Sequence, residues 1–172
     1  MTAPAAPALI SPAAVSEIAF REAMSEIPAA VHVITTGGPA GRRGLTATAV
    51  TSLSVTPPMM LVCIHADSAT LAAIEANRAF CINALSGDEQ SVAETFAGRR
   101  GLQGEARFSV GDWTEMVTGA PRLATSLVSF DCRLKEARIM ATHRIVIGEV
   151  VAIGSNVHGD GLIYRNRRFG RF

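Results

Sequence analysis

The sequence predicts a mainly β protein, an antiparallel barrel with a few helices packed against its outside. Three observations lead to this class. Six or seven stretches have the apolar patterns of strands, most of them are separated by hairpin-length turns, and only three short stretches have a helical pattern. Regular alternation of strands and helices, which would indicate a parallel sheet, is not seen. At 172 residues, the chain is long enough for one domain with one substantial core.

Residues 1–15, "MTAPAAPALISPAAV", are rich in Ala and Pro and carry no positive charge before their apolar part. They predict a flexible lead-in rather than a signal peptide, followed by one domain over residues 16–172. The domain starts with a predicted amphipathic helix that Pro28 ends. Its apolar positions are spaced i, i+3, i+4, i+7 and are Phe20, Ala23, Met24 and Ile27.

The first strands are predicted around a hairpin. "VHVITT" at 31–36 is one strand, "GGPAGRRG" is a turn, and the stretch 44–55, "GLTATAVTSLSV", is expected to continue as one second strand. The third strand, "MMLVCIH" at 59–65, is an unbroken apolar run, which predicts burial on both of its faces.

Two short helices follow, with a strand between them. The first covers 68–77, with Ser68 as its N-cap, and the second covers 88–98 and ends at a glycine. The strand between them is "AFCINAL" at 79–85. Residues 99–122 are rich in turn residues and are expected to be irregular, with Trp113 as an apolar anchor.

Two long strands close the predicted sheet. They are "TSLVSFDCRLKEA" at 125–137 and "HRIVIGEVVAIGS" at 143–155, and "RIMAT" connects them. The tail "GLIYRNRRF" at 161–169 is expected to add one last strand.

Composition excludes several function classes. The net charge is +1, and the arginines cluster at 42–43, 99–100 and 165–171, a pattern that suits small anions better than nucleic acid. The three cysteines, Cys63, Cys81 and Cys132, form no CxxC pair, so we expect no metal site, and reduced thiols in a cytoplasmic protein. No apolar run approaches the length of a membrane span, so no membrane partner is expected.

A row of hydroxylated residues is the most informative local feature. With a period of two, one face of the stretch 44–55 would carry Thr46, Thr48, Val50, Ser52 and Ser54. Small hydroxylated side chains let a ligand approach the backbone and offer both donors and acceptors. Threonine is also a favourable residue on a solvated strand, so the pattern alone leaves both interpretations open.

The other candidates are weaker on the residues alone. The glycines at 37–44 match no phosphate-loop spacing and indicate a hairpin turn. His143 begins a strand, where a side chain can face a cleft, whereas His32 and His65 have the pattern of surface or packing residues. Cys81 would be a nucleophile only if its pKa were depressed. Asp131 and Glu149 lie within strands and are equally compatible with exposed or barrel-edge charges.

Taken together, the ordered motifs resemble the short-chain flavin reductases, the reductase partners of two-component flavin monooxygenases. The resemblance covers about residues 18–170. The motifs that carry it are "FREAMSEIPAAVHVITT", "GLTATAVTSLSVTPPMMLVC", "FCINALS", "FAG" followed by "RF", "GAPRL", "SFDCRL", "THRIVIGEV" and "GLIYRNRRF".

The resemblance implies an FMN-binding split barrel in a homodimer whose subunits share the flavin sites. It implies that the flavin ring and ribityl chain lie along Thr46, Ala47, Thr48, Ala49, Val50 and Ser52. Ser68 would approach the flavin phosphate, and the other side of the ring would be lined by Asn83, Ala84 and Leu85. His143 would lie beside the nicotinamide, with Tyr164 and Arg167 near the same pocket.

The function that the resemblance implies is hydride transfer from NADH or NADPH to N5 of FMN or FAD, with release of reduced flavin to a monooxygenase. Two alternatives stay open: flavin-dependent reduction of a corrinoid cobalt, and a non-catalytic flavin- or heme-binding module. Several relatives carry a lysine or an arginine in the loop before the helix at 68–77, where this chain has Asp67. Nearby arginines could then supply the cation for the phosphate.

Overall fold

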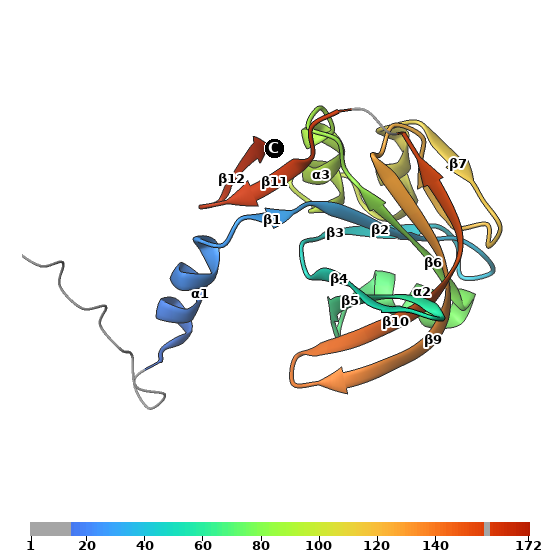
Figure 1. Cartoon of the computed structure of the whole chain (residues 1–172), viewed down its shortest axis with the longest axis horizontal. Coiled ribbons are helices and arrows are strands. Elements are labelled where there is room, and N and C mark those ends of the chain that lie inside the picture. Colours follow the sequence, from blue (N-terminus) through green and yellow to red (C-terminus); the bar gives the residue numbers. More distant parts are fainter. Residues whose placement is uncertain (1–14, 157–158) are drawn as a thin grey trace, which may run out of the picture.

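A computed structural model describes residues 15–156 and 159–172, so the predicted lead-in falls almost entirely outside the described residues. The main body is a strongly curved seven-stranded sheet in the order β3-β2-β6-β9-β10-β5-β4 (Figure 1). The strands are β2 (His32–Thr36), β3 (Arg43–Ala47), β4 (Val50–Val55), β5 (Pro58–His65), β6 (Ala79–Ala84), β9 (Val128–Met140) and β10 (His143–Ser155).

This sheet confirms the predicted fold class, because every strand pair in the part of the chain that the structure describes is antiparallel. The two edge strands, β3 and β4, are consecutive in sequence and only Thr48 and Ala49 separate them. Such a link spans at most about 11 Å, so the two edges must approach each other at this end. The sheet is therefore a barrel that is split between β3 and β4.

The single strand expected over 44–55 is wrong, because this stretch is divided between the two edges of the sheet. Residues before the link pair with β2, and residues after it pair with β5. The link also resets the alternation: Leu45, Ala47 and Val50 all pack against the same hydrophobic core. Pairing with different partners thus overrides the local period of two.

The three predicted helices are confirmed as α1 (Glu17–Ser25), α2 (Ala69–Asn77) and α3 (Gln90–Phe96). Ser68 is the N-cap residue of α2, and Arg78 ends that helix in the left-handed conformation, with φ of 61°. None of the residues of α1 is buried, and Figure 1 shows the helix standing away from the sheet. Its C-terminal end is held by Asn166, whose N–H donates to the carbonyl oxygen of Ser25 at 2.7 Å.

Two cores lie on opposite faces of β2 and β6. One contains Ile34 and Ile82 with Leu71 and Ile74 of α2. The other contains Val33 with residues of α3 and of the 3₁₀ helix η2 (Gly104–Ser109). Trp113 packs on Phe96 and Phe108 in this second core, with ring centroids 5.2 and 5.0 Å away, which confirms it as an anchor.

The prediction that β5 is buried on both faces is wrong. Val62 and Ile64 are buried, whereas Cys63 is half-buried and His65 is exposed. The apolar run cannot reveal this difference, because it depends on what covers each face. One face of β5 lies on the core, and its other face lines a cavity.

The structure also contains strands that the sequence patterns did not separate. In the region expected to be irregular, β7 (Trp113–Glu115) pairs with β8 (Pro121–Leu123). The tail forms two strands, β11 (Leu162–Arg165) and β12 (Arg168–Arg171), which continue a small sheet with β1 (Ala29–Ala30).

The turns that connect β11 to β12 and β9 to β10 are each two residues long. Asn166 and Arg167 have φ of 48° and 60°, the conformation that a tight two-residue hairpin turn requires. Strand β9 extends to Met140, so Ala141 and Thr142 alone form the turn to β10, with φ of 51° at Ala141. The predicted connection "RIMAT" is therefore mostly strand. No helix among the described residues is long and apolar enough to cross a membrane.

Candidate functional site

Three cavities meet at Thr48, where β3 ends and the chain crosses to β4. We call them the hydroxyl cavity, the aromatic cavity and the hairpin cavity, with volumes of about 320, 190 and 460 Å³. Thr48 lines all three, and Thr46, Ala47 and Ala49 each line two of them. The short side chains of this link therefore expose backbone to a shared space.

The hydroxyl cavity contains two histidines on adjacent strands. His143, the first residue of β10, is directly opposite His65, the last residue of β5, and their ring centroids are 5.3 Å apart at an interplanar angle of 73°. Nδ1 of His65 accepts a hydrogen bond from the backbone N–H of Asp67 at 3.3 Å. Cys63 and Ser68 complete the wall, so this cavity offers imidazole, thiol and hydroxyl groups.

The aromatic cavity is bounded by Tyr164 and Phe169, whose ring centroids are 5.0 Å apart. The guanidinium of Arg99 lies over both rings, 5.6 and 5.8 Å from their centroids, and its Nη2 donates to the hydroxyl of Tyr164 at 2.9 Å. Rings and a cation on one side, with small strand residues on the other, suit a planar ligand with a polar edge.

The hairpin cavity lies between the end of α1 and the turn of β11 and β12. Met24, Ile27 and Ala29 make much of its lining apolar, and Arg167 enters from the hairpin turn. Polar contacts hold the turn against the helix: Arg165 Nη2 is 3.0 Å from the Glu26 carboxylate. The cavity thus depends on segments from both ends of the described chain.

Thr46 of β3 and Thr48 of the link are not equivalent. Oγ1 of Thr46 donates to the carbonyl oxygen of Ala93 at 2.6 Å, so its proton is already engaged by α3. Among the described residues, the exposed Thr48 hydroxyl makes no hydrogen bond to the protein, and it remains available to a ligand. Of these two threonines, Thr48 is therefore the one whose hydroxyl is free for a ligand.

No Asp or Glu of the described residues lines any of the three cavities. A paired-carboxylate mechanism has no components here. The site offers binding groups of neutral or positive character, so what it can do chemically is to hold a polar or anionic ligand in a fixed orientation.

The structure brings most of the predicted site residues together at these cavities. They are Thr46, Ala47, Thr48, Ala49, Ser68, His143, Tyr164 and Arg167. The other predicted residues, Val50, Ser52, Asn83, Ala84 and Leu85, line none of the three. Val50 packs on the core, Ser52 is exposed on β4, and Leu85 belongs to the second core.

Asn83 is a fully buried polar hub rather than a cavity residue. Its Nδ2 donates to the carbonyl oxygen of Val33 at 3.1 Å. Its Oδ1 accepts from the backbone N–H of Leu123 at 2.9 Å and from the hydroxyl of Ser129 at 2.8 Å. Since buried amides are stable only when their hydrogen bonds are satisfied, this side chain joins β2, β8 and β9 around β6.

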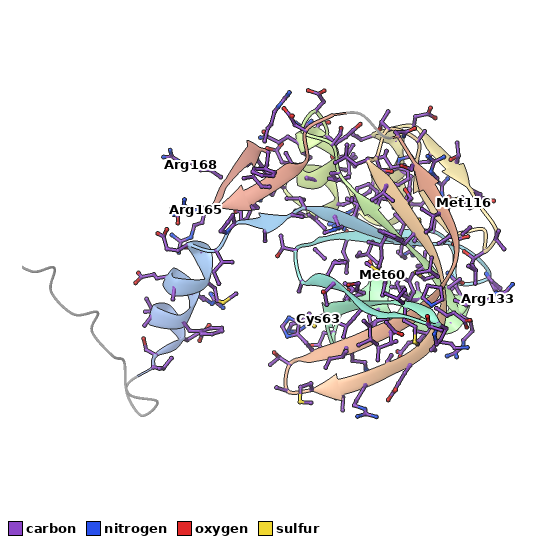
Figure 2. All side chains as sticks on the ribbon, viewed as in Figure 1. Met60, Cys63, Met116, Arg133, Arg165 and Arg168 are labelled. Carbon is purple, nitrogen blue, oxygen red and sulfur yellow. The ribbon has the colours of Figure 1, made fainter. Side chains whose placement is uncertain are left out.

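The cavity residues that sequence reasoning missed include Cys63, His65, Arg99 and Phe169. The side chain of Cys63 lies close to the space between α1 and the barrel in Figure 2. The available signal for His65 was its place at the end of a strand, directly before a helix cap. Its pairing with His143 depends on strand register, which no local pattern contained.

Other candidates belong to the interior. Burial raises the pKa of the Cys81 thiol, and burial also raises that of Cys132, to about 12, so both stay protonated at neutral pH and neither is an activated nucleophile. Asp131 is fully buried and accepts from the backbone N–H of Thr118 at 2.8 Å, so it is not an exposed charge. Burial lowers the pKa of His32.

In residues 15–156 and 159–172, no three His, Cys, Asp or Glu side chains form a possible metal-ligand group.

Comparison with known proteins connects this arrangement with one family. The family described as "Flavin reductase like domain" matches residues 24–172. The FMN reductase (NADH) RutF of Pseudomonas syringae pv. syringae is 42% identical over 168 residues, which cover 98% of this chain and 93% of that protein. FMN reductase (NADH) RutF 1 of Methylorubrum extorquens is 43% identical over 155 residues, 90% of this chain and 76% of that protein.

Solved structures show the same fold. The NADH:FAD oxidoreductase SgcE6 of Streptomyces globisporus superposes with a TM-score of 0.86 at 28% identity, covering 98% of this chain and 99% of that one. BorF, the flavin reductase component of a bacterial two-component tryptophan halogenase, gives a TM-score of 0.83 at 29% identity, covering 91% and 98%.

Asn83→Ala tests whether this residue stabilises the fold through its buried hydrogen bonds. The substitution leaves the N–H of Leu123 and the hydroxyl of Ser129 with lost partners, so we expect the free energy of unfolding to fall by about 2–4 kcal/mol. Urea unfolding followed by circular dichroism measures this change. Ser52→Ala, on an exposed position of β4, is the control and should change it by less than about 0.5 kcal/mol. An Asn83→Ala protein as stable as wild type would contradict the structural role.

Proposed function

The chain belongs to the flavin reductase family, and from this membership we propose that it is an NADH-dependent flavin reductase that transfers a hydride from NADH to FMN. The observation that carries the proposal is the convergence of three carboxylate-free cavities on residues 46–49, the end of β3 and the link that follows it. These residues are part of "GLTATAVTSLSVTPPMMLVC", one of the motifs that carry the resemblance to the family. Hydride transfer between two cofactors needs positioning rather than a strong acid or base, which agrees with the residues present.

The donor set suits a flavin. Ala47 and Ala49 allow a flat ring to approach the backbone, and the Thr48 hydroxyl is available to hydrogen-bond its polar edge. Tyr164 and Phe169 offer aromatic surface beside the same link. Bound flavin would supply the hydride acceptor, and the protein would supply orientation and partial exclusion of water.

We assign the remaining roles by position in the cavities. Ser68 lies at the start of α2 and is proposed to approach the flavin phosphate. His143 is proposed to lie beside the nicotinamide, with Tyr164 and Arg167 near the same pocket. Asn83 and Ala84 pair with Val33 and His32 of β2, and the N–H of Leu85 donates to the carbonyl oxygen of Val31, so we propose that these three residues act on the site through the chain of β2.

The wider setting is also a proposal. Reduced flavin would pass by diffusion to a partner monooxygenase. This proposal is supported by BorF, which is the flavin reductase component of a two-component system. A homodimer is supported by the exposed apolar side chains of α1, including Ile18 and Phe20, which are 71% and 58% exposed. FAD as a second flavin and NADPH as a second donor stay within the proposal, and the three free cysteines agree with a cytoplasmic location.

The proposed activity is tested by mixing the purified protein with NADH and catalytic FMN in air. We expect catalytic loss of absorbance at 340 nm, because reduced FMN is released and reoxidised. Absence of turnover with FMN, FAD and riboflavin, and with both NADH and NADPH, would overturn the proposal. Tight, non-exchanging cofactor without turnover would indicate a binding module, and anaerobic reduction of a corrinoid in preference to free flavin would indicate the cobalt reductase.

Thr48→Val separates a ligand-binding hydroxyl from a solvated one. Replacing the hydroxyl with a methyl group of similar size removes one neutral hydrogen bond, so we expect the dissociation constant for FMN to rise by about two- to tenfold. Quenching of flavin fluorescence measures it. The control is Thr51→Val on β4, which removes a hydroxyl that lines none of the three cavities and should leave the affinity unchanged. Equal affinities in wild type and Thr48→Val would mean that this face is only solvated.

His143→Ala addresses the nicotinamide side of the site. Loss of the imidazole should lower kcat with NADH by about tenfold through poorer positioning, while FMN binding changes little. Steady-state kinetics with varied NADH, together with the fluorescence titration, distinguish the two effects. If kcat is retained and FMN affinity falls instead, His143 contacts the flavin and not the donor.

A further inference from the structure

The hydroxyl cavity contains two histidines, and the proposed function uses only one of them. His143 is proposed to lie beside the nicotinamide, whereas His65 lines the same cavity without an assigned role. The two residues are directly opposite on β10 and β5, and their rings meet edge to face with centroids 5.3 Å apart. Such an arrangement is attractive, because the positive edge of one ring meets the negative face of the other. His65 is therefore a direct contact of the proposed donor-side ring.

His143 receives little support from its own segment. It is exposed, and as the first residue of β10 it directly follows the turn of Ala141 and Thr142. An exposed side chain at such a position can occupy several rotamers, and most of them would turn the imidazole away from the cavity. Its Nδ1 lies 2.9 Å from the hydroxyl oxygen of Thr142, which belongs to the same turn. Support from a second element has to come from β5.

His65 is held by the loop that leads into α2. The backbone N–H of Asp67 donates to Nδ1 of His65 at 3.3 Å. Because Nδ1 accepts this hydrogen bond, the neutral ring carries its proton on Nε2. The backbone is tied as well, since the N–H of Ser68 donates to the carbonyl oxygen of His65 at 3.0 Å. The orientation of this ring is thus fixed by backbone groups on its own side of the cavity.

Backbone contacts also fix the two histidines relative to each other. The N–H of Ala66 donates to the carbonyl oxygen of Thr142 at 3.0 Å, which joins the loop before α2 to the turn before β10. The pairing of β5 with β10 continues without a register shift from His65 and His143 to Met59. The contact between the rings therefore depends on their rotamers and not on sliding of the strands.

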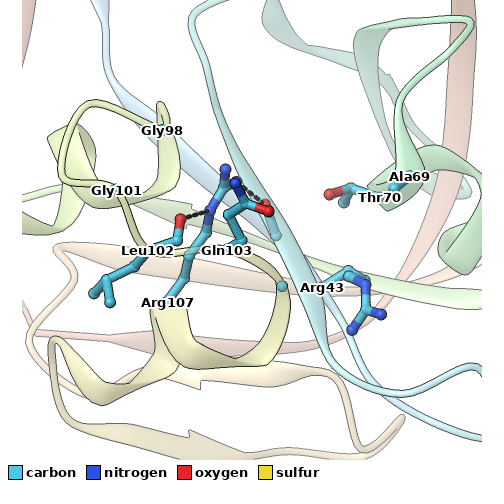
Figure 3. Close-up of a pocket in the computed structure, with 10 residues that line it drawn as sticks. Arg43, Ala69, Thr70, Gly98, Gly101, Leu102, Gln103 and Arg107 are labelled. Atoms are coloured by element: carbon cyan, nitrogen blue, oxygen red, sulfur yellow. Dashed lines mark hydrogen bonds between the residues drawn. The ribbon is translucent and has the colours of Figure 1, made fainter.

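The histidine pair belongs to the hydroxyl cavity alone. A fourth cavity, of about 300 Å³, adjoins it along β3, and Figure 3 shows Arg43 and Arg107 in its lining. The two cavities are neighbours because Gly44 lines the fourth and the next residue, Leu45, lines the hydroxyl cavity. Neither histidine lines the fourth, the aromatic or the hairpin cavity. A substitution of His65 consequently leaves the lining of the other three cavities unchanged.

We propose that His65 is a positioning residue for the donor side of the site, and that its fixed imidazole holds the ring of His143 in the orientation that contacts the nicotinamide. This inference rests on the proposed function and on the role proposed there for His143. His65 acts through the orientation of His143 and does not touch the reacting atoms. The two histidines then form a unit, so His65 affects hydride transfer only while His143 is present.

The test compares wild type with His65→Ala, His143→Ala and the double variant. Reduction of FMN by saturating NADH is followed anaerobically in a stopped-flow instrument as loss of flavin absorbance. His65→Ala should lower the rate constant by about three- to tenfold, the range expected for loss of one aromatic contact, while the Kd for FMN stays within about twofold of wild type. In the His143→Ala background, the same substitution should change the rate constant by less than about twofold.

His65→Phe tests the ring contact itself. Phenylalanine keeps an aromatic edge beside His143 and loses the two ring nitrogens, so it should restore the rate constant to within about twofold of wild type. A phenylalanine variant as slow as His65→Ala would show that a ring nitrogen, and not the ring contact, is required, and would overturn the positioning role.

Ile139→Ala is the matched control on the same hairpin. Ile139 is 64% exposed on β9 and lines none of the four cavities. Its neighbour Met140 is the residue paired with His143, and successive strand residues face opposite sides, so Ile139 lies on the face away from His143. This substitution should leave the rate constant unchanged. Thermal melting of each variant verifies that it is folded.

The outcomes separate this proposal from the proposed function. An unchanged rate constant in His65→Ala, or an equal loss with and without His143, would overturn the positioning role and leave the reductase intact. A higher Kd for FMN in His65→Ala, with an unchanged rate constant at saturating FMN, would assign His65 to the flavin instead. Failure of wild type to reduce FMN would overturn both.

Discussion

The structure depends on one short crossing of the chain between the two edges of its main sheet. Thr48 and Ala49 connect β3, which pairs with β2, to β4, which pairs with β5. Two residues cannot cover a long gap, so the sheet has to curl until its edges almost meet. The carbonyl oxygen of Ala49 accepts from the N–H of Cys63 at 3.0 Å, which ties the crossing to β5. The split in the barrel is therefore also where backbone and small side chains are open to a ligand.

The buried polar side chains form their hydrogen bonds within the protein interior and do not line the cavities at this opening. Asn83 satisfies donors and acceptors from β2, β8 and β9, and Asp131 is held by Thr118. Because unsatisfied buried polar groups are costly, these contacts keep the barrel wall behind the crossing in one register. The cavities in front contain hydroxyl, imidazole and guanidinium groups and no carboxylate of the described residues. This division leaves the ligand side with a positive character.

Sequence patterns predicted many of the elements and part of the candidate site. The three helices, the antiparallel class and the anchoring role of Trp113 follow from periodicity and composition, because a helix cap or an apolar stripe is a local property. The burial of β5 and the division of residues 44–55 were predicted wrongly, since both depend on which strand becomes the neighbour. Val50 is an example. The alternation predicted it on the same face as Thr46 and Thr48, whereas in the structure it packs against the core together with Leu45 and Ala47.

By itself, the sequence determined the small, hydroxylated run around Thr46 and Thr48 and the motifs that place the chain in the flavin reductase family. Only the tertiary structure decided which of its hydroxyls are free, because Thr46 donates to α3 and Thr48 does not. It alone paired His65 with His143 and brought Arg43 and Arg107 into one cavity from residues 64 positions apart. The physical reason is that strand register and the packing of distant loops determine which side chains come together, and a local pattern of residues contains information on neither.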